Sequence, residues 1–193
     1  MKIIFAVVAI SIIIIGYIPY LKDIFARKTA PHIYTWLIWL ITQSTAIAAL
    51  IYGGGKMGGA GLVAGVILVF VIFLLAFKYG TKNITASDTI LLAFSILAIA
   101  VWWQLDSPLL SVVIISLIDG IAYLPTFRKT YVEPHSETAS FWALMALSNV
   151  FGILASAEYN LLTMTYLSTL ALANIFLFFL IVVRRRTVER EGK

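Results

Sequence analysis

The sequence contains no cysteine, only two histidines and few charged residues. Without cysteine the chain has no disulfides, no thiolate metal ligands and no cysteine nucleophile. Charged residues make up 12% of the 193 residues, whereas about a quarter of the residues of a soluble domain are charged. This scarcity of charge excludes a soluble globular protein.

Hydrophobic residues form 62% of the chain, its mean hydropathy is +1.01, and these residues are gathered in seven long runs. The runs lie at about 3–21, 32–52, 59–77, 87–105, 108–127, 138–157 and 161–183. A helix needs about 20 residues to cross roughly 30 Å of hydrocarbon, and helices satisfy their own backbone hydrogen bonds in lipid. The sequence therefore predicts an all-α membrane protein with seven transmembrane helices in the lipid bilayer.

Lysine and arginine are distributed unevenly between the two sides of this topology. Twelve of the 14 lie in the first, third and fifth connections or in the C-terminal tail, and only Lys2 and Lys56 lie on the other side. Cytoplasmic loops carry the excess of positive charge, so we expect the N-terminus outside and the C-terminus in the cytoplasm of a plasma (inner) membrane. The net charge of +5 then reflects topology and attraction to anionic lipid, and it implies no nucleic-acid partner.

One segment occurs twice, about a hundred residues apart. Residues 17–39 read YIPYLKDIFARKTAPHIYTWLIW, and residues 123–142 read YLPTFRKTYVEPHSETASFW. Both contain Tyr-x-Pro, a basic cluster, a Pro-His pair and a Trp seven residues after the histidine. An offset of 106 residues pairs the first prolines, and an offset of 103 residues pairs Trp39 with Trp142. An internal repeat in an apolar chain is typical of membrane transporters.

The repeat extends to the neighbouring apolar runs and divides the chain. We predict a first three-helix repeat at 1–80, a linker helix at 81–106, a second three-helix repeat at 107–184 and a basic cytoplasmic tail at 185–193. Because the first helix of each repeat starts outside, the two three-helix bundles are parallel.

The repeated segments resemble two PQ-loop motifs. Pro19-Tyr20 is followed by Lys22 and Arg27-Lys28-Thr29, and Pro125-Thr126 is followed by Arg128-Lys129-Thr130. With its three-plus-one-plus-three layout, which the PnuC vitamin transporters share, the chain resembles the SWEET and PQ-loop superfamily. The glutamine of the motif is replaced by Tyr20 and Thr126. The resemblance implies a carrier of a small polar, sugar-like solute that works by alternating access. It also implies that Pro19 and Pro125 are hinges of the inner gate, and the alternative is a static kink in each helix.

The matched tryptophans are the first candidates for a solute site. Trp39 and Trp142 lie about two turns inside their helices, where two aromatic faces could form a slot for a flat ring or a sugar. SWEET transporters use a matched Trp pair in this way, and the resemblance implies the same role here. The alternative is packing between helices. Four other aromatic residues fall at predicted membrane boundaries and are predicted to form an aromatic belt: Tyr34, Trp36, Trp102 and Trp103.

Polar side chains continue the helix faces that carry these tryptophans. Gln43 follows Trp39 by four residues, and Asn149 follows Trp142 by seven. Asn174 lies midway along the seventh run, opposite Leu68 in the first repeat, whereas SWEET transporters pair asparagines of the third and seventh helices. The alternative role of each asparagine is a hydrogen bond between helices. The predicted solute-binding residues are Trp39, Gln43, Trp142, Asn149 and Asn174.

Asp119 is the one acid that lies well inside an apolar run, and its counterpart in the first repeat is Ile13. A charge at this depth costs at least about 2.5–3.5 kcal/mol on insertion scales, so a functional role is the first hypothesis. Ser116, Tyr123 and Thr126 lie on the same helix face, so we expect Asp119 to face a polar cavity. There it would couple transport to a proton or hold a cation. The alternative is a hydrogen-bonded structural carboxyl.

The two histidines are predicted to be structural. His32 and His135 each follow a proline at a membrane boundary, which favours a helix cap or a headgroup contact over proton transfer. Two histidines without clustered carboxylates make no metal site, so we expect no metal and no other cofactor. No catalytic residues are indicated, and we expect no enzyme. Two alternatives stay open: a proton-coupled or facilitative amino-acid or vitamin carrier, and a non-transporting receptor or assembly protein. A homo-oligomer is compatible with either.

Overall fold

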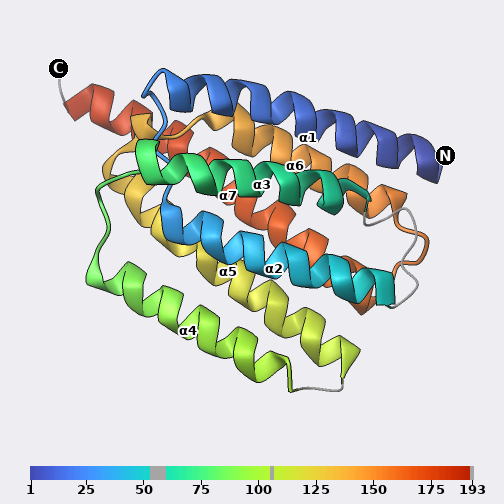
Figure 1. Ribbon diagram of the computed structural model, residues 1–193. Coiled ribbons are helices and arrows are strands. Elements are labelled where there is room, and N and C mark those ends of the chain that lie inside the picture. Colours follow the sequence, from blue (N-terminus) through green and yellow to red (C-terminus); the bar gives the residue numbers. More distant parts are fainter. Residues whose placement is uncertain (53–59, 105–106, 192–193) are drawn as a thin grey trace.

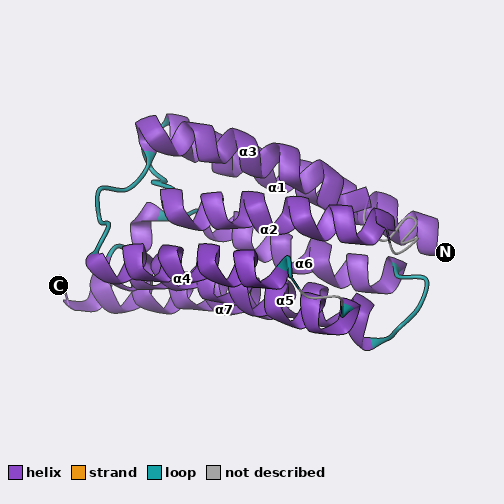
Figure 2. Ribbon diagram, turned by 60° about the horizontal axis from the view of Figure 1, so that its bottom comes forward, coloured by secondary structure: helices purple, strands orange, loops and turns teal. Residues whose placement is uncertain are grey.

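The computed structural model is all-helical, which confirms the predicted fold class at that level (Figure 1). It describes residues 1–52, 60–104 and 107–191, and none of these residues lies in a strand (Figure 2). The helices are α1 (Lys2–Phe25), α2 (Ile33–Tyr52), α3 (Ala60–Tyr79), α4 (Ala86–Trp102), α5 (Pro108–Val132), the short 3-10 helix η2 (Pro134–Ser136), α6 (Ala139–Ala155) and α7 (Leu161–Glu191).

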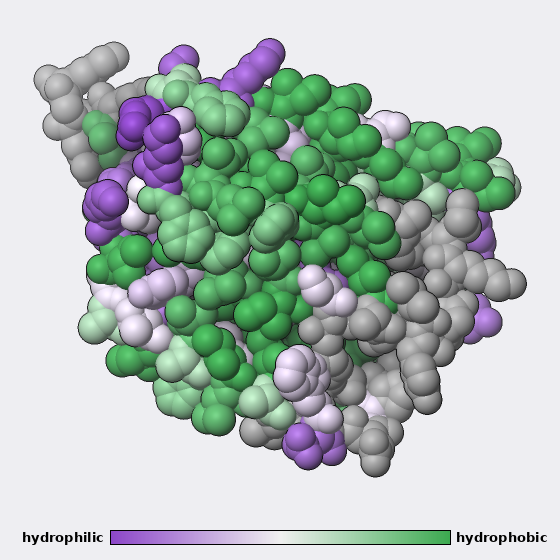
Figure 3. Space-filling model, in the orientation of Figure 1, coloured by the Kyte–Doolittle hydropathy of each residue, from purple (hydrophilic) through white to green (hydrophobic). Residues whose placement is uncertain are grey.

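The α-helices lie along a common direction, and the two chain termini lie at opposite ends of the bundle (Figure 1). Helices α1, α3, α5 and α7 finish at the end that holds the C-terminus, which we call the C-terminal end. On the face shown in Figure 3, hydrophilic side chains gather towards that end, and the flanks of the helices are mostly apolar. On this face the charged and polar side chains are thus most concentrated near the C-terminal end.

Three helical stretches are long and apolar enough to cross a membrane by length and composition, namely Lys2–Phe25, Leu62–Tyr79 and Met164–Val188. Ala86–Leu97 and Ala139–Ala155 are apolar but shorter. Large exposed apolar side chains on the three long stretches include Ile3, Ile14, Ile67, Phe77 and Leu172. Soluble proteins rarely expose continuous apolar surface of this kind, so these helices favour association with a membrane.

The helices pack in two sets with the same order of neighbours. In the first set α3 packs against both α1 and α2, and in the second set α7 packs against both α5 and α6. The sets meet where α1 packs on α6 and where α2 packs on α5. Helix α4 packs on α5 and α2, outside both sets. The candidate site residues described below lie where the two sets meet.

Three helices run four or more residues further at the C-terminal end than their apolar runs. Helix α1 reaches Phe25 instead of 21, α5 reaches Val132 instead of 127, and α7 reaches Glu191 instead of 183. Lysine, arginine and glutamate are good helix formers, so the first charges end an apolar run without ending the helix. The residues predicted as a basic tail are therefore helical as far as 191, and these three helices extend beyond the apolar runs.

Helix α1 ends in a Schellman motif that turns the chain sharply. The amides of Arg27 and Lys28 donate to the carbonyls of Ile24 at 3.0 Å and Asp23 at 2.8 Å. Arg27 has a φ of 56°, a left-handed conformation that usually favours glycine. Its guanidinium lies over the ring of Tyr79, 5.2 Å from the centroid. This turn directs the α1–α2 loop across the C-terminal end towards the second helix set.

Gly16 lies at the contact between α1 and α6, and we expect Gly16→Ala to destabilise the fold. A Cβ at this position would lie 2.7 Å from Met145 Cε and 3.2 Å from Leu144 Cβ. The Met145 side chain could rotate away, but Leu144 Cβ is fixed to its helix, so the helices would have to separate. Overpacking of this kind costs about 1–3 kcal/mol of unfolding free energy.

Denaturation of the protein in detergent would measure this effect, with Gly120→Ala as the matched control. A Cβ at Gly120 would meet only Thr169 Cγ2, at an ordinary 3.7 Å, so we expect no loss there and a small gain from helix propensity. Equal stability of the two variants would contradict the prediction.

Candidate solute-binding site

The five predicted solute-binding residues line one cavity between the two helix sets. Trp39, Gln43, Trp142, Asn149 and Asn174 all contribute to its wall. The cavity has a volume of about 70 Å³, which is room for several water molecules. Most of its other lining side chains are apolar or aromatic, and the lining residues come from both helix sets. An apolar wall with a few placed polar groups is typical of sites for small molecules.

Aromatic rings close this cavity towards the C-terminal end. The ring centroids of Trp39 and Trp142 lie 5.9 Å apart with their planes at 64°, and Tyr123 lies 4.6 Å from Trp39. Tyr17 meets Phe141 edge to face at 5.0 Å. The two tryptophans thus contact each other, and no flat ring fits between them in this conformation. The open space lies beside the pair, so the predicted slot is closed here.

Trp36 belongs to this aromatic layer, and its predicted place in an aromatic belt was wrong. Its side chain is 1% exposed, and its ring lies 6.3 Å from Tyr17 and 5.5 Å from Tyr20. Position near the end of an apolar run indicates depth but does not indicate which way a side chain faces. Trp103 is 68% exposed, as an aromatic belt requires, and the side chain of Trp102 lies outside the described residues.

The polar groups on the cavity wall differ in their hydrogen bonding. Asn149 and Asn174 each donate to a backbone carbonyl one turn earlier, at 2.9 and 2.8 Å. Asn174 also accepts from the Tyr123 hydroxyl at 3.1 Å. This bond links α5 to α7, and a hydrogen bond between helices was the alternative role predicted for Asn174. Trp39 Nε1 is buried and has no partner among the described residues. An unpaired buried donor costs about 1–3 kcal/mol, and an acceptor in the cavity would remove this cost.

Asp119 lies outside the wall of this cavity, between α5, α2 and α7. Its side chain is fully buried, and its two oxygens accept from the hydroxyl groups of Thr42 and, at 2.8 Å, Tyr166. No ion pair to Asp119 is present among the described residues. The predicted polar face is only partly formed, because Ser116 bonds to its own helix and Thr126 to Thr35. Asp119 is therefore held by hydroxyl groups, next to the cavity residue Tyr123, and no cation of the described residues pairs with it.

Polar contacts close the C-terminal end between the α1–α2 loop and the α5–α6 connection. Lys129 and Glu137 form an ion pair with side chains that are 0% and 1% exposed. The ammonium of Lys129 also donates to the Ala30 carbonyl at 2.7 Å, and the hydroxyl oxygens of Thr29 and Thr138 lie 2.6 Å apart. The sequence pattern places Lys129 in an exposed basic cluster and does not mark Glu137 as its partner. The only signal is an opposite charge eight residues later, across a Pro-His turn.

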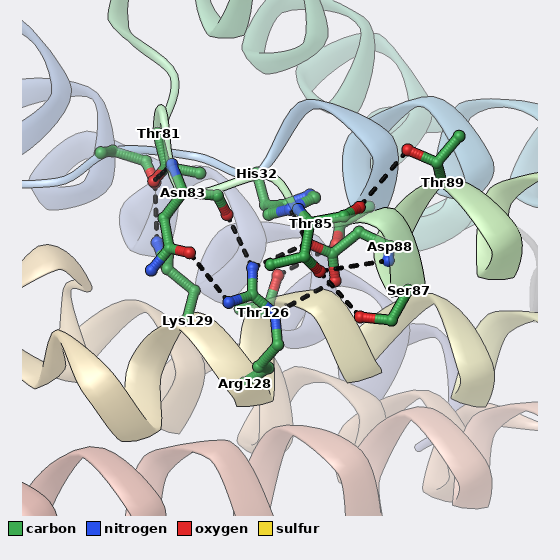
Figure 4. Close-up of polar contacts among 12 residues, drawn as sticks. His32, Thr81, Asn83, Thr85, Ser87, Asp88, Thr89, Thr126, Arg128 and Lys129 are labelled. Carbon is green, nitrogen blue, oxygen red and sulfur yellow. Dashed lines mark hydrogen bonds and ion pairs between the residues drawn. The ribbon is translucent and has the colours of Figure 1, made fainter.

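Asp88, in the first turn of α4, joins both helix sets at the same end (Figure 4). It accepts from Arg128 Nη2 at 2.7 Å and from Arg128 Nε at 3.2 Å, and it lies 3.4 Å from His32 Nε2. Arg128 also donates to the side chain and the backbone of Asn83, at 2.8 and 2.7 Å. His32 is thus buried against an acid instead of touching headgroups, whereas its repeat counterpart His135 is exposed. Sequence reasoning missed this contact because α4 has no counterpart in the repeat.

The two predicted hinge prolines lie inside continuous helices. Pro19 is followed by six more residues of α1, as far as Phe25, and Pro125 by seven more residues of α5, as far as Val132. Each proline removes one amide donor from its helix, so both helices have a weak point just before the closed C-terminal end. Along the chain Pro19 lies between the cavity residue Tyr17 and Asp23, which bonds to Thr138, and Pro125 lies between the cavity residue Tyr123 and Lys129.

Comparison with known proteins finds no family model, no curated protein and no solved structure that matches this chain. The interpretation of the site therefore depends on the chain's own residues and geometry.

Proposed function

We propose that this protein is a membrane carrier that moves a small polar, sugar-like solute by alternating access. The observation that carries the proposal is the cavity, because five residues chosen from the repeat, on three different apolar runs, line one space between the two helix sets. Its wall offers neutral polar groups and aromatic faces, which suits a neutral polar solute. The cavity also favours a carrier over an assembly protein, which needs no space for a solute between the helix sets.

The proposed architecture is two parallel three-helix bundles joined by α4, with all seven helices in the membrane and the C-terminus in the cytoplasm. The matching order of neighbours supports it, because α3 lies between α1 and α2 as α7 lies between α5 and α6. The exposed apolar side chains of the long helices support a membrane environment. In this orientation the C-terminal end faces the cytoplasm, so the closed layer of Lys129, Glu137 and Asp88 would be the inner gate.

Alternating access then requires this inner layer to open while the opposite end closes. The prolines Pro19 and Pro125 would supply the hinges, because each lies between the cavity and the polar closure. The described conformation, with the C-terminal end closed, would be a state that does not release solute to the cytoplasm.

Asp119 favours a second candidate, a proton-coupled carrier of an amino acid or a vitamin. A fully buried carboxyl that is held only by hydroxyl groups is a natural site for proton uptake and release. This candidate shares the cavity and the architecture with the first, and differs in the solute and in the driving force.

Uptake into proteoliposomes tests the proposal, with a panel of sugars, amino acids and vitamins, each with and without a pH gradient. We expect saturable uptake of one solute class. We also expect Asn174→Leu, which introduces the residue of the first repeat, to reduce that uptake about tenfold or more, because it removes polar contacts from the wall. Trp103→Ala is the control, because this side chain is exposed and remote from the cavity. Absence of uptake across the whole panel would contradict the carrier and favour the receptor.

A further inference from the structure

The two matched tryptophans have different hydrogen bonds although both line the cavity. Trp39 and Trp142 are 4% and 1% exposed. Trp142 Nε1 donates to Glu137 Oε2 at 3.0 Å, whereas Trp39 Nε1 has no partner in the described part of the chain. A symmetrical pair of ligand-binding rings would leave both indole N–H groups available to the solute. Only Trp39 can donate to a solute without breaking an existing bond.

The partner of Trp142 belongs to the closure of the C-terminal end. One oxygen of Glu137 accepts from Trp142, and the other accepts from the ammonium of Lys129. That ammonium also donates to the carbonyls of Ala30, at 2.7 Å, and Ser136, at 3.3 Å. Ala30 lies in the α1–α2 loop of the first helix set. A continuous series of hydrogen bonds therefore leads from a cavity ring to the loop that closes the C-terminal end.

The first repeat contains no equivalent of this connection. With the repeat offsets, Glu137 corresponds to Tyr34 and Lys129 corresponds to Asp23. Neither position supplies a carboxylate to Trp39, which accounts for its unpaired N–H. The difference between the tryptophans thus arises from residues at the gate and not from the cavity wall.

We propose that the two tryptophans have different roles, one in recognition of the solute and the other in gating of the inner end. Trp39 donates its indole N–H to the solute, and Trp142 is a positioning residue that ties the cavity to the inner closure through Glu137 and Lys129. The solute half of this proposal rests on the proposed carrier function, and the gating half does not. A solute that moves the Trp142 ring would remove a hydrogen-bond donor from Glu137. The Lys129 ammonium would then no longer be positioned to donate to the Ala30 carbonyl. Occupancy of the cavity would in this way shift the population towards an open inner end.

The absence of cysteine makes the gating half directly testable, because one introduced thiol is the only one in the chain. Thr130→Cys is a suitable reporter, since Thr130 is fully buried and its hydroxyl has no partner among the described residues. It lies one helical turn beyond Thr126, which meets Thr35 of the first set at 3.0 Å. A maleimide would therefore reach this thiol only when the inner end opens.

In this background we expect Trp142→Phe to raise the rate of maleimide labelling about tenfold, the factor that loss of a hydrogen bond to a charged group gives. Glu137→Gln is expected to raise it as well, because it removes the charge that holds Lys129. Trp39→Phe is the matched control and should leave the rate unchanged. The gating half is overturned if Trp142→Phe labels like its parent, or if Trp39→Phe labels as fast as Trp142→Phe. If Trp142→Phe does not fold, an unchanged rate in Glu137→Gln overturns it.

The solute half is tested with whichever solute the proteoliposome panel identifies. Trp39→Phe should weaken binding of that solute about fivefold through loss of one neutral hydrogen bond, with the labelling rate unchanged. Unaltered binding in Trp39→Phe overturns this half. A panel without uptake would refute the carrier function. Because labelling requires no solute, the labelling rates would still test the connection between Trp142 and the closure.

Discussion

Replacing Glu137 by alanine is expected to lower the free energy of unfolding by about 3–5 kcal/mol. The variant would leave the ammonium of Lys129 buried with only the carbonyls of Ala30 and Ser136 as partners, and it would leave the indole N–H of Trp142 unpaired. A buried charge without its counter-ion is among the largest destabilising effects of a single substitution. Denaturation in detergent, followed by far-ultraviolet circular dichroism, would measure the loss.

Two further variants separate the ion pair from the loss of side-chain volume. Glu133→Ala, at an exposed acid in the same connection, should change stability by no more than about 0.5 kcal/mol. The double variant Lys129→Met with Glu137→Leu should recover most of the loss, because removal of both charges leaves no unpaired ion. A double variant that is less stable than Glu137→Ala alone would show that the pair is not the cause.

Asp119→Asn is expected to abolish accumulation of solute driven by a pH gradient. A carrier that moves one proton with each neutral solute can accumulate it about tenfold for each pH unit, since one unit corresponds to about 1.4 kcal/mol. Asparagine can still bond to Thr42 and Tyr166, but it has no proton to exchange, so uptake should fall to simple equilibration while exchange of internal for external solute persists. Uptake in proteoliposomes at several imposed pH differences would measure the change.

The control for this substitution is Thr42→Val, which removes one hydroxyl and keeps the carboxyl. It should retain accumulation under a pH gradient even if its rate falls. If uptake by the unmodified protein does not depend on pH and Asp119→Asn behaves in the same way, proton coupling is excluded. Asp119 would then be a structural carboxyl.

Sequence reasoning was most successful where the repeat fixed positions along a helix. The offset of 103 residues identified Trp39 and Trp142 as partners, and helical spacing added Gln43 and Asn149 on the same faces, so the structure brings them to one cavity. Periodicity determines which side chains share a face, and hydropathy determines that a run is helical. Both properties depend only on residues within one helix, so they can be predicted from the sequence.

The contacts at the C-terminal end that the sequence did not predict depend on how separate helices and loops pack against each other. The pairing of Lys129 with Glu137 and of Asp88 with Arg128 requires the α1–α2 loop, the start of α4 and the end of α5 to meet at the C-terminal end. No spacing within one helix encodes that meeting. Trp36 shows the same limit, because its position along α2 does not determine its direction, and the ring of Phe141 in the opposite set packs against it.

The continuation of α7 past its apolar run has a mechanical consequence. At a rise of 1.5 Å per residue its 31 residues extend about 46 Å, so a hydrocarbon layer of about 30 Å leaves roughly three turns projecting. On that projecting part Arg184 and Arg185 donate to the carbonyls of Tyr131 and Pro134, at 2.9 and 3.0 Å. One continuous helix thus connects Asn174 at the cavity to the connection between α5 and α6. Asn174 and Arg185 are about 16 Å apart along this helix, so a tilt of a few degrees at the cavity would move the arginines by about 1 Å.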